Sequence, residues 1–300
     1  MVVKPELIMK TKSKQVHKRR ESIKKIKVLT RYFILTAIAF IMFYPLLWLI
    51  GASFKTNSEI FTSIGVLPPR IDFTSYIEGW KTSTEYTFTT YFINTFKYVI
   101  PRVVLTVISS VFTAYGFARF NFRYKKFLFA LLIGTLFLPK IILRIPSYLL
   151  WKTFGMLDSF YPLFIDAGFA VDAFFVFMLI QFFRSIPREL DESAIVDGCN
   201  SFQTLVYILL PLLKPAIITV ALFQFMWSMN DFMGPLIYIS SVEKYPVAIA
   251  LKMSMDTTAG VFAWNRVIAM SLLALVPSIV LFFSAQKHFV EGISTSGIKG

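Results

Sequence analysis

The 300-residue sequence contains few of the residues on which most enzymes depend. It has one cysteine and two histidines, and charged residues make up only 16% of the chain. The single Cys199 cannot form an intrachain disulfide, and no cysteine–histidine spacing indicates a zinc site. Because His17 and His288 stand near opposite ends of the chain, the sequence offers almost no material for a histidine-based catalytic or metal centre.

Apolar residues, in contrast, are abundant. Hydrophobic residues make up 56% of the chain, aromatic residues 17%, and the mean hydropathy is +0.65. A soluble domain has ~45–50% apolar and ~25% charged residues. A soluble chain of this size buries ~75% of its unfolded surface and could not hide so much Phe, Ile and Leu. This composition excludes an ordinary soluble enzyme and predicts a membrane protein.

Six stretches are long and apolar enough to cross a bilayer. A spanning helix needs ~20 mostly apolar residues for ~30 Å of hydrocarbon. The candidates are 32–51, 98–118, 127–146, 160–183, 215–240 and 267–286. Pro139, Lys140 and Arg144 interrupt the third near its end. Because the runs are continuously apolar, they favour helices over barrel strands, and the sequence predicts an all-α membrane protein with six transmembrane helices.

Lys and Arg are distributed unevenly between the connecting segments. Segments 1–31, 119–126, 184–214 and 287–300 hold 20 of them in 84 residues, while 52–97, 147–159 and 241–266 hold 8 in 85. The positive-inside rule therefore places both termini in the cytoplasm. The predicted organisation is a basic N-terminal segment at 1–31, a six-helix domain at 32–286 and a C-terminal tail at 287–300.

The N-terminal segment 1–31 alone carries 11 Lys and Arg. We favour contact with anionic membrane lipid, to which each such residue contributes ~1 kcal/mol. The alternative is an enlarged positive-inside signal, and nucleic acid is not an expected partner.

The loop after the fourth span reads RSIPRELDESAIVDGCNSFQTLVYILLPLLKP, residues 184–215. Pro187 suits a first helical position, and acidic residues crowd the first turn, where the helix dipole favours negative charge. Gly198 fits the left-handed position that ends a helix. Asn200 and Gln203 form a capping-box pattern for a second helix. These signals alone leave two interpretations open: a rigid knob that docks into another protein, and an ordinary interfacial hairpin.

The spacing of the loop residues favours the first interpretation. Glu192-Ser193-Ala194 is followed by Gly198 and then, after nine intervening residues, by Ile208-Leu209-Leu210-Pro211. This order resembles the EAA–G–I-x-L-P signature of binding-protein-dependent ABC importer permeases, with Ser193 in place of the first alanine. Further segments resemble the MalG-like half of carbohydrate importers: AYGFARFNFRYKK (114–126), LP (138–139), WSMNDFMGPLIY (227–238) and GISTSGIKG (292–300). The resemblance covers roughly residues 30 to 300.

The resemblance implies a type I ABC importer permease with a cytoplasmic EAA coupling-helix loop at 184–214, in a bacterial inner membrane. Its implied partners are a MalF-like second permease, a dimer of cytoplasmic ABC ATPases and an extracytoplasmic sugar-binding protein, which would contact the loop at 241–266. The implied ATPase-coupling residues are Glu192, Ser193, Ala194, Gly198 and Pro211, with Gly297 and Gly300 in a tail that reaches the ATPase interface.

The chain has no phosphate-binding loop of the G-x-x-x-x-G-K-[ST] type. We therefore expect ATP and Mg²⁺ at the partner ATPase, no cofactor bound by this chain, and no catalytic residue in it.

Six ionisable residues fall within or at the edges of the predicted spans: Arg102, Lys140, Arg144, Asp166, Asp172 and Asp231. Each would cost ~2.5–3.5 kcal/mol or more at the bilayer centre, so interior or aqueous surroundings are expected. Positions at the membrane interface remain the alternative for those nearest the outer side. Asp172 is deeper, and pairing with a neighbouring helix is its alternative.

Asn230 and Asp231 lie in the middle of the fifth span, just before Gly234 and Pro235, which would break the helix. Polar groups at a broken helix are how membrane substrate sites are commonly built. Sugars bind through hydrogen bonds and ring stacking, and Trp227 and Tyr238 lie nearby. These four residues, Trp227, Asn230, Asp231 and Tyr238, are therefore candidates for a substrate path, with packing against a partner permease as the alternative.

The predicted function is ATP-driven import of a sugar or oligosaccharide. Basic Lys140, Arg144 and Lys152 favour an acidic, uronate-containing oligosaccharide; a neutral mono- or oligosaccharide and a glycerol phosphate remain alternatives. A membrane-embedded enzyme would need paired histidines or an activated nucleophile. An ion-coupled secondary transporter would usually need more spans, and no clear internal repeat supports one.

Overall fold

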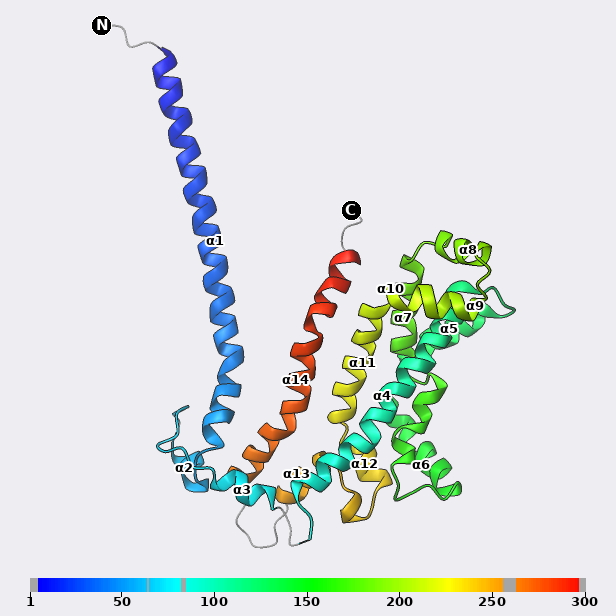
Figure 1. Ribbon diagram of the computed structural model, residues 1–300. Helices are drawn as coiled ribbons and strands as arrows, with labels where there is room; N and C mark the ends of the chain where they lie inside the picture. Colours follow the sequence, from blue (N-terminus) through cyan, green and yellow to red (C-terminus); the bar gives the residue numbers. More distant parts are fainter. Residues whose placement is uncertain (1–4, 64, 82–84, 256–262, 297–300) are drawn as a thin grey trace. The chain divides into compact units, whose positions relative to one another are not determined.

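The computed structural model describes residues 5–63, 65–81, 85–255 and 263–296, and every regular element in these ranges is helical (Figure 1). The predicted all-α class is confirmed. The chain divides into two compact units, Met1–Asp72 and Phe73–Gly300.

The first unit consists of a long helix and a short one. Helix α1 (Pro5–Ala52) runs without interruption through both the basic segment and the first apolar run. Its 48 residues extend over ~72 Å at 1.5 Å per residue, more than twice the ~30 Å of a hydrocarbon core. No described side chain from Lys24 to Ile50 is buried. Helix α2 (Asn57–Thr62) follows, with a capping box between Thr56 and Glu59.

The second unit is organised around helix α4 (Phe88–Arg119), which packs against α7 (Ala173–Ser185) and α11 (Lys214–Met229). Helix α14 (Trp264–Ser296) packs against α11 and α3 (Thr74–Trp80). Buried apolar side chains join α4, α7 and α11 into one core. Many apolar side chains remain exposed on the outer faces of these helices, as is expected where lipid is the solvent.

Two pairs of consecutive helical segments are sharply bent, and the first pair contains the third predicted span. Helix α5 (Lys125–Leu136) meets the η1–α6 segment (Lys140–Leu143, Arg144–Thr153) at 98°. The Ser201–Leu212 segment meets α11 at 78°. Within the described residues, four helices are long and apolar enough to span a bilayer, and six spans result if each bent pair is one span.

The fourth and fifth predicted spans are discontinuous helices. The stretch 160–183 contains the short turns η2 (Tyr161–Leu163) and η3 (Ile165–Phe169), and α7 starts only after Ala170, whose φ is 54°. The stretch 215–240 is divided into α11 and α12 (Met233–Tyr238), so the break lies at residues 230–232 and not beyond them. The remaining elements are α8 (Glu189–Val196), α9 (Ser201–Gln203), the π-helical η4 (Thr204–Leu209), α10 (Leu210–Leu212), η5 (Val242–Lys244) and α13 (Val247–Met255).

Candidate functional site

Helix α8 presents the EAA residues on an exposed surface. Glu192 and Ser193 are exposed, whereas Ala194 is buried and α8 packs against η4. The apolar side chains of Ile195 and Val196, next to Ala194 in the sequence, are also exposed, that of Val196 to 87%. Sequence analysis did not single out these two apolar residues, although their place directly after the motif was the available signal. Exposed apolar groups rimmed by polar ones are typical of a protein-binding surface.

The turn after α8 has the geometry that the sequence predicts. Gly198 adopts a φ of +82°, its N–H donates to the carbonyl oxygen of Ile195 (3.0 Å), and the N–H of Cys199 donates to that of Ala194 (2.9 Å). This pair of bonds is the Schellman motif. A Cβ at position 198 would meet no heavy atom within 4 Å. The requirement for glycine is therefore conformational and not steric.

The next helix starts with the predicted capping box. The N–H of Gln203 donates to Asn200 Oδ1, and the N–H of Asn200 donates to Gln203 Oε1, both at 2.9 Å. Pro211 lies within the one-turn α10, just before the 78° bend into α11. Helix α8 begins at Glu189, not at Pro187 as predicted.

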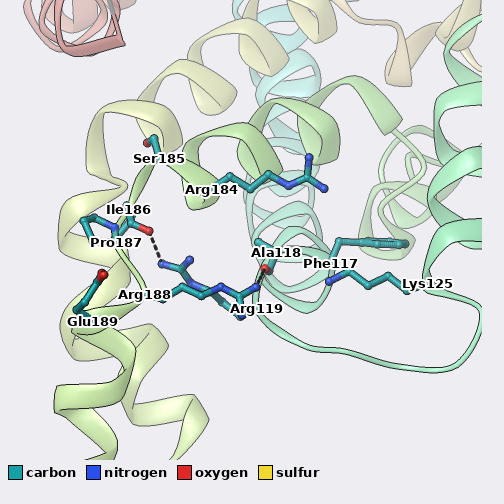
Figure 2. Close-up of a pocket in the computed structure, with 10 residues that line it drawn as sticks. All are labelled: Phe117, Ala118, Arg119, Lys125, Arg184, Ser185, Ile186, Pro187, Arg188 and Glu189. Carbon is teal, nitrogen blue, oxygen red and sulfur yellow. Dashed lines mark hydrogen bonds between the residues drawn. The ribbon is translucent and has the colours of Figure 1, made fainter. Parts of the chain in front are cut away.

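The loop is fastened to the end of α4 by three polar side chains. Arg119 Nη2 lies 3.1 Å from Asp191 Oδ2 and donates to the carbonyl oxygen of Ile186 at 3.1 Å. Arg188 Nη2 donates to the carbonyl oxygen of Ala118 at 3.4 Å (Figure 2). Tyr115 Oη donates to the carbonyl oxygen of Ser201 at 2.9 Å. These contacts tie the loop to the end of α4.

A second polar site lies near the break between α11 and α12. The structure pairs all six ionisable residues of the predicted spans: Arg102 with Asp166 (3.6 Å), Arg144 with Asp231 (3.5 Å) and Lys140 with Asp172 (2.6 Å). For Asp172 the structure thus shows the alternative given above, a pairing with a neighbouring segment. Lys140 Nζ also lies 5.6 Å from the centre of the Trp227 ring, within the range of a cation–π interaction.

The four candidate substrate-path residues line two cavities beside these ion pairs. Trp227, Asn230 and Asp231 line a cavity of about 550 Å³. Asp231 also lines a cavity of about 280 Å³, together with Tyr238. Asn230 Nδ2 donates to the carbonyl oxygen of Met226 (2.8 Å), and Asp231 Oδ1 accepts from the N–H of Gly234 (3.0 Å). Asn230 thus binds a carbonyl group in the last turn of α11, and Asp231 binds an N–H group in the first turn of α12.

Two buried acceptors belong to residues that line the larger cavity: Asp172, which the sequence analysis named but did not place in the substrate path, and Gln224, which it did not name. Asp172 is only 5% exposed and Gln224 is buried. Among the described residues, Asp172 Oδ2 and Gln224 Oε1 have no hydrogen-bond partner. Buried polar atoms are almost always hydrogen-bonded in proteins. The two oxygens are therefore exceptions to this rule, and both belong to residues that line the cavity.

A third feature joins two loops outside the candidate spans. Asp158 accepts hydrogen bonds from the N–H groups of Ser240 (3.0 Å) and Ser241 (2.9 Å), from Ser241 Oγ (2.6 Å) and from Lys244 Nζ (2.9 Å). Partial burial opposes ionisation, but these hydrogen bonds outweigh it and hold the pKa of the carboxyl well below its usual range. The start of the 241–266 loop is thereby fixed to the 154–160 segment. The predicted tail residues Gly297 and Gly300 lie outside the described residues.

Comparison with known proteins establishes the family. Residues 106–294 match the model of the binding-protein-dependent transport system inner membrane component family. The chain belongs to this family. The galactooligosaccharides transport system permease protein GanQ of Bacillus subtilis is 31% identical over 92% of this chain and 96% of that protein. The polygalacturonan/rhamnogalacturonan transport system permease protein YtcP of the same organism is 29% identical over 90% of this chain and 96% of that one.

A solved structure agrees with this assignment. The crystal structure of a bacterial ABC transporter involved in the import of the acidic polysaccharide alginate matches with a TM-score of 0.76 and 25% identity, over 88% of this chain and 97% of that chain. The protein is thus a multi-pass permease of a carbohydrate ABC importer. Such permeases are not themselves enzymes. They work with a second permease, a separate ATPase and a binding protein.

Proposed function

We propose that this permease forms half of the path for an oligosaccharide, with the cavity beside Trp227 as its sugar-contacting wall. The observation that carries the proposal is the unpartnered pair of buried acceptors, Asp172 Oδ2 and Gln224 Oε1, next to an exposed indole ring. Sugar hydroxyls would satisfy these acceptors, and the Trp227 ring would stack on the apolar face of a pyranose. Asn230 and Asp231 also line this cavity, and Asp231 and Tyr238 line the smaller cavity.

The EAA loop is the proposed dock for the ATPase. Glu192 and Ser193 supply exposed polar groups, Val196 an exposed apolar one, and Ala194 lets α8 pack closely on η4. Gly198 sets the turn and Pro211 precedes the bend into α11. Because Arg119 and Arg188 fasten this loop to α4, movement of α8 would be transmitted to the spans.

The proposed assembly adds to this chain a MalF-like permease, an ATPase dimer that holds ATP and Mg²⁺, and an extracytoplasmic sugar-binding protein at the 241–266 loop. Both termini lie in the cytoplasm, and the Gly297 and Gly300 tail reaches the ATPase interface. This chain binds no cofactor.

The preferred substrate is an oligosaccharide that contains uronate. The Lys140 side chain is 72% exposed although its partner Asp172 is buried, so the ammonium group can turn toward a substrate carboxylate. Two similar proteins are named for acidic glycans, a polygalacturonan/rhamnogalacturonan permease and an alginate importer. A neutral oligosaccharide is the second candidate, because three carboxylates balance the three cations and GanQ is named for galactooligosaccharides.

Two proposals can be tested together: that the cavity beside Trp227 belongs to the sugar path, and that the substrate contains uronate. The test measures uptake of radiolabelled oligogalacturonates and galactooligosaccharides by cells that carry the whole importer. Trp227→Ala should lower uptake of the transported sugar at least tenfold, and unchanged uptake would remove the cavity from the path. Lys140→Gln should reduce oligogalacturonate uptake selectively. Lys152, which the sequence analysis grouped with Lys140 and Arg144, lines neither cavity, so Lys152→Gln should leave this uptake unchanged. Uptake of galactooligosaccharides alone would establish the neutral candidate.

A further inference from the structure

A separate cavity of about 580 Å³ lies where the end of α4, the start of α5 and the α7–α8 junction meet (Figure 2). Its lining residues are Phe117, Ala118, Arg119, Lys125, Arg184, Ser185, Ile186, Pro187, Arg188 and Glu189. Four of these side chains are cationic and one is a carboxylate. The cavity therefore has a surplus of positive charge. Arg119 and Arg188 also fasten the EAA loop to α4, but neither the proposed coupling nor the proposed sugar path assigns a ligand to this cavity.

Among the described residues, only one of the four cations forms an ion pair. Arg119 is paired with Asp191. Lys125 Nζ donates to the carbonyl oxygen of Phe120 (2.7 Å), and Arg188 Nη2 to that of Ala118 (3.4 Å). Arg184 lies over the ring of Phe129, 5.4 Å from its centre. Within the part of the chain that the structure describes, none of Lys125, Arg184 and Arg188 forms an ion pair with a carboxylate.

The cations stand at the level where candidate spans end. Arg119 ends the span Phe88–Arg119, Lys125 begins α5, and Arg184 is one residue from the end of the span Ile165–Ser185. On α5, directly after Lys125 and Lys126, the apolar side chains of Phe127 and Leu128 are exposed. Cations at a span end beside exposed apolar helix surface fit a phospholipid, with its headgroup in the cavity and its acyl chains along α5.

We propose that this cavity binds a phosphate group, and that an anionic phospholipid of the cytoplasmic leaflet supplies it. Lys125, Arg184 and Arg188 would surround the phosphate oxygens. The bound headgroup would bridge α5, the end of α7 and the segment that enters α8, and so hold the EAA loop at a fixed height relative to the membrane. The source of the phosphate rests on the proposed orientation, in which this end of the spans faces the cytoplasm.

The test is a lipid titration of the full-length chain, purified in detergent with the subunits that accompany it and stripped of native lipid. Dioctanoyl phosphatidylglycerol, dioctanoyl phosphatidylcholine and soluble glycerol phosphate are added separately, and binding is followed by thermal stability and native mass spectrometry. We expect phosphatidylglycerol to bind at least tenfold more tightly than the other two. Each of K125Q, R184Q and R188Q should weaken it about fivefold, equivalent to ~1 kcal/mol per cation.

Two matched variants serve as controls. K126Q removes the lysine next to Lys125, and R123Q removes another arginine that lies near an aromatic ring, here that of Tyr124. Neither residue lines the cavity, so both variants should bind phosphatidylglycerol as the unmodified chain does. Equal losses in cavity and control variants would show a diffuse surface attraction and overturn the site.

Three further outcomes would overturn the proposal. Equal affinity for phosphatidylglycerol and phosphatidylcholine would exclude recognition of an anionic headgroup. Tighter binding of glycerol phosphate than of lipid would exclude the lipid as the source. Loss of the ATPase from K125Q, R184Q and R188Q, with unchanged lipid binding, would make the cavity part of a protein interface. Since lipid binding is measured without sugar, failure of the proposed transport role would appear separately, in the uptake assay.

Discussion

The EAA loop and the ion-paired cavity show two ways in which one chain builds a polar site in a membrane protein. The EAA loop is local: its turn, its capping box and its helix ends join residues that are three to five positions apart. The cavity is assembled by packing, and Arg144 meets Asp231 across 87 positions of sequence. Local motifs therefore describe the first site well and the second hardly at all.

The two sites also differ in where they leave charge exposed. At the EAA loop the cation is buried: Arg119, at the end of α4, has a side chain that is 7% exposed and lies 3.1 Å from Asp191. In the cavity the carboxylate of Asp172 is buried, while its partner Lys140 faces outward. A buried cation can serve as a fixed anchor, whereas an outward cation can exchange partners with a ligand.

The largest expected effect comes from the turn that ends α8. Gly198→Val should abolish sugar uptake while the chain remains in the membrane, because a β-branched residue in the left-handed region costs ~1–3 kcal/mol and the turn would open. Uptake by whole cells and the amount of chain in isolated membranes check this.

Gly155→Val is the matched control, since Gly155 also has a positive φ (67°) and open space around its Cβ position but lies outside the EAA loop. We expect this variant to keep most of its uptake. If Gly198→Val transports normally, or if both variants lose uptake equally, the specific coupling role of this turn is wrong.

A smaller and contrasting pair of effects concerns two aspartates that form ion pairs, Asp191 and Asp172. Asp191→Asn leaves the buried Arg119 without its countercharge, and removal of one partner of a buried pair costs ~3–5 kcal/mol. Asp172→Asn leaves an exposed Lys140, so its cost should stay within ~1 kcal/mol. Thermal unfolding of the purified chain with its accompanying subunits should therefore show a clearly larger drop for Asp191→Asn. A larger drop in thermal stability for Asp172→Asn than for Asp191→Asn would contradict this. It would mean that the loop moves in the Asp191→Asn variant and that water then solvates Arg119.

Sequence reasoning found what depends on neighbouring residues. The helical class, the turn at Gly198 and the Asn200–Gln203 capping box follow from local backbone and hydrogen-bond preferences, and the motif order identified the family. It also located Asn230 and Asp231 near a broken helix, although the break falls on these residues and not after them.

What the sequence did not predict depends on tertiary packing. Arg102, Lys140 and Arg144 appeared as separate charges with an interface alternative, because nothing in a linear pattern tells which carboxylate each cation meets. The break of the fourth span at Ala170 was missed for a related reason. Hydropathy measures apolar content, not backbone continuity, and Ala170 adopts its positive φ without a glycine to signal it.

The smallest effect compares two capping boxes that have the same chemistry. Asn200→Ala and Thr56→Ala each remove the side-chain oxygen that accepts an N–H at the start of a short helix, a loss of ~1 kcal/mol. Both variants should lower thermal stability by similar small amounts. Only Asn200→Ala loosens the entry to α9 in the EAA loop, so uptake should fall several-fold in that variant and stay near normal in Thr56→Ala. Equal uptake in the two would mean that the loop transmits motion without a fixed α9, and that α8 with its anchor at Arg119 is sufficient for coupling.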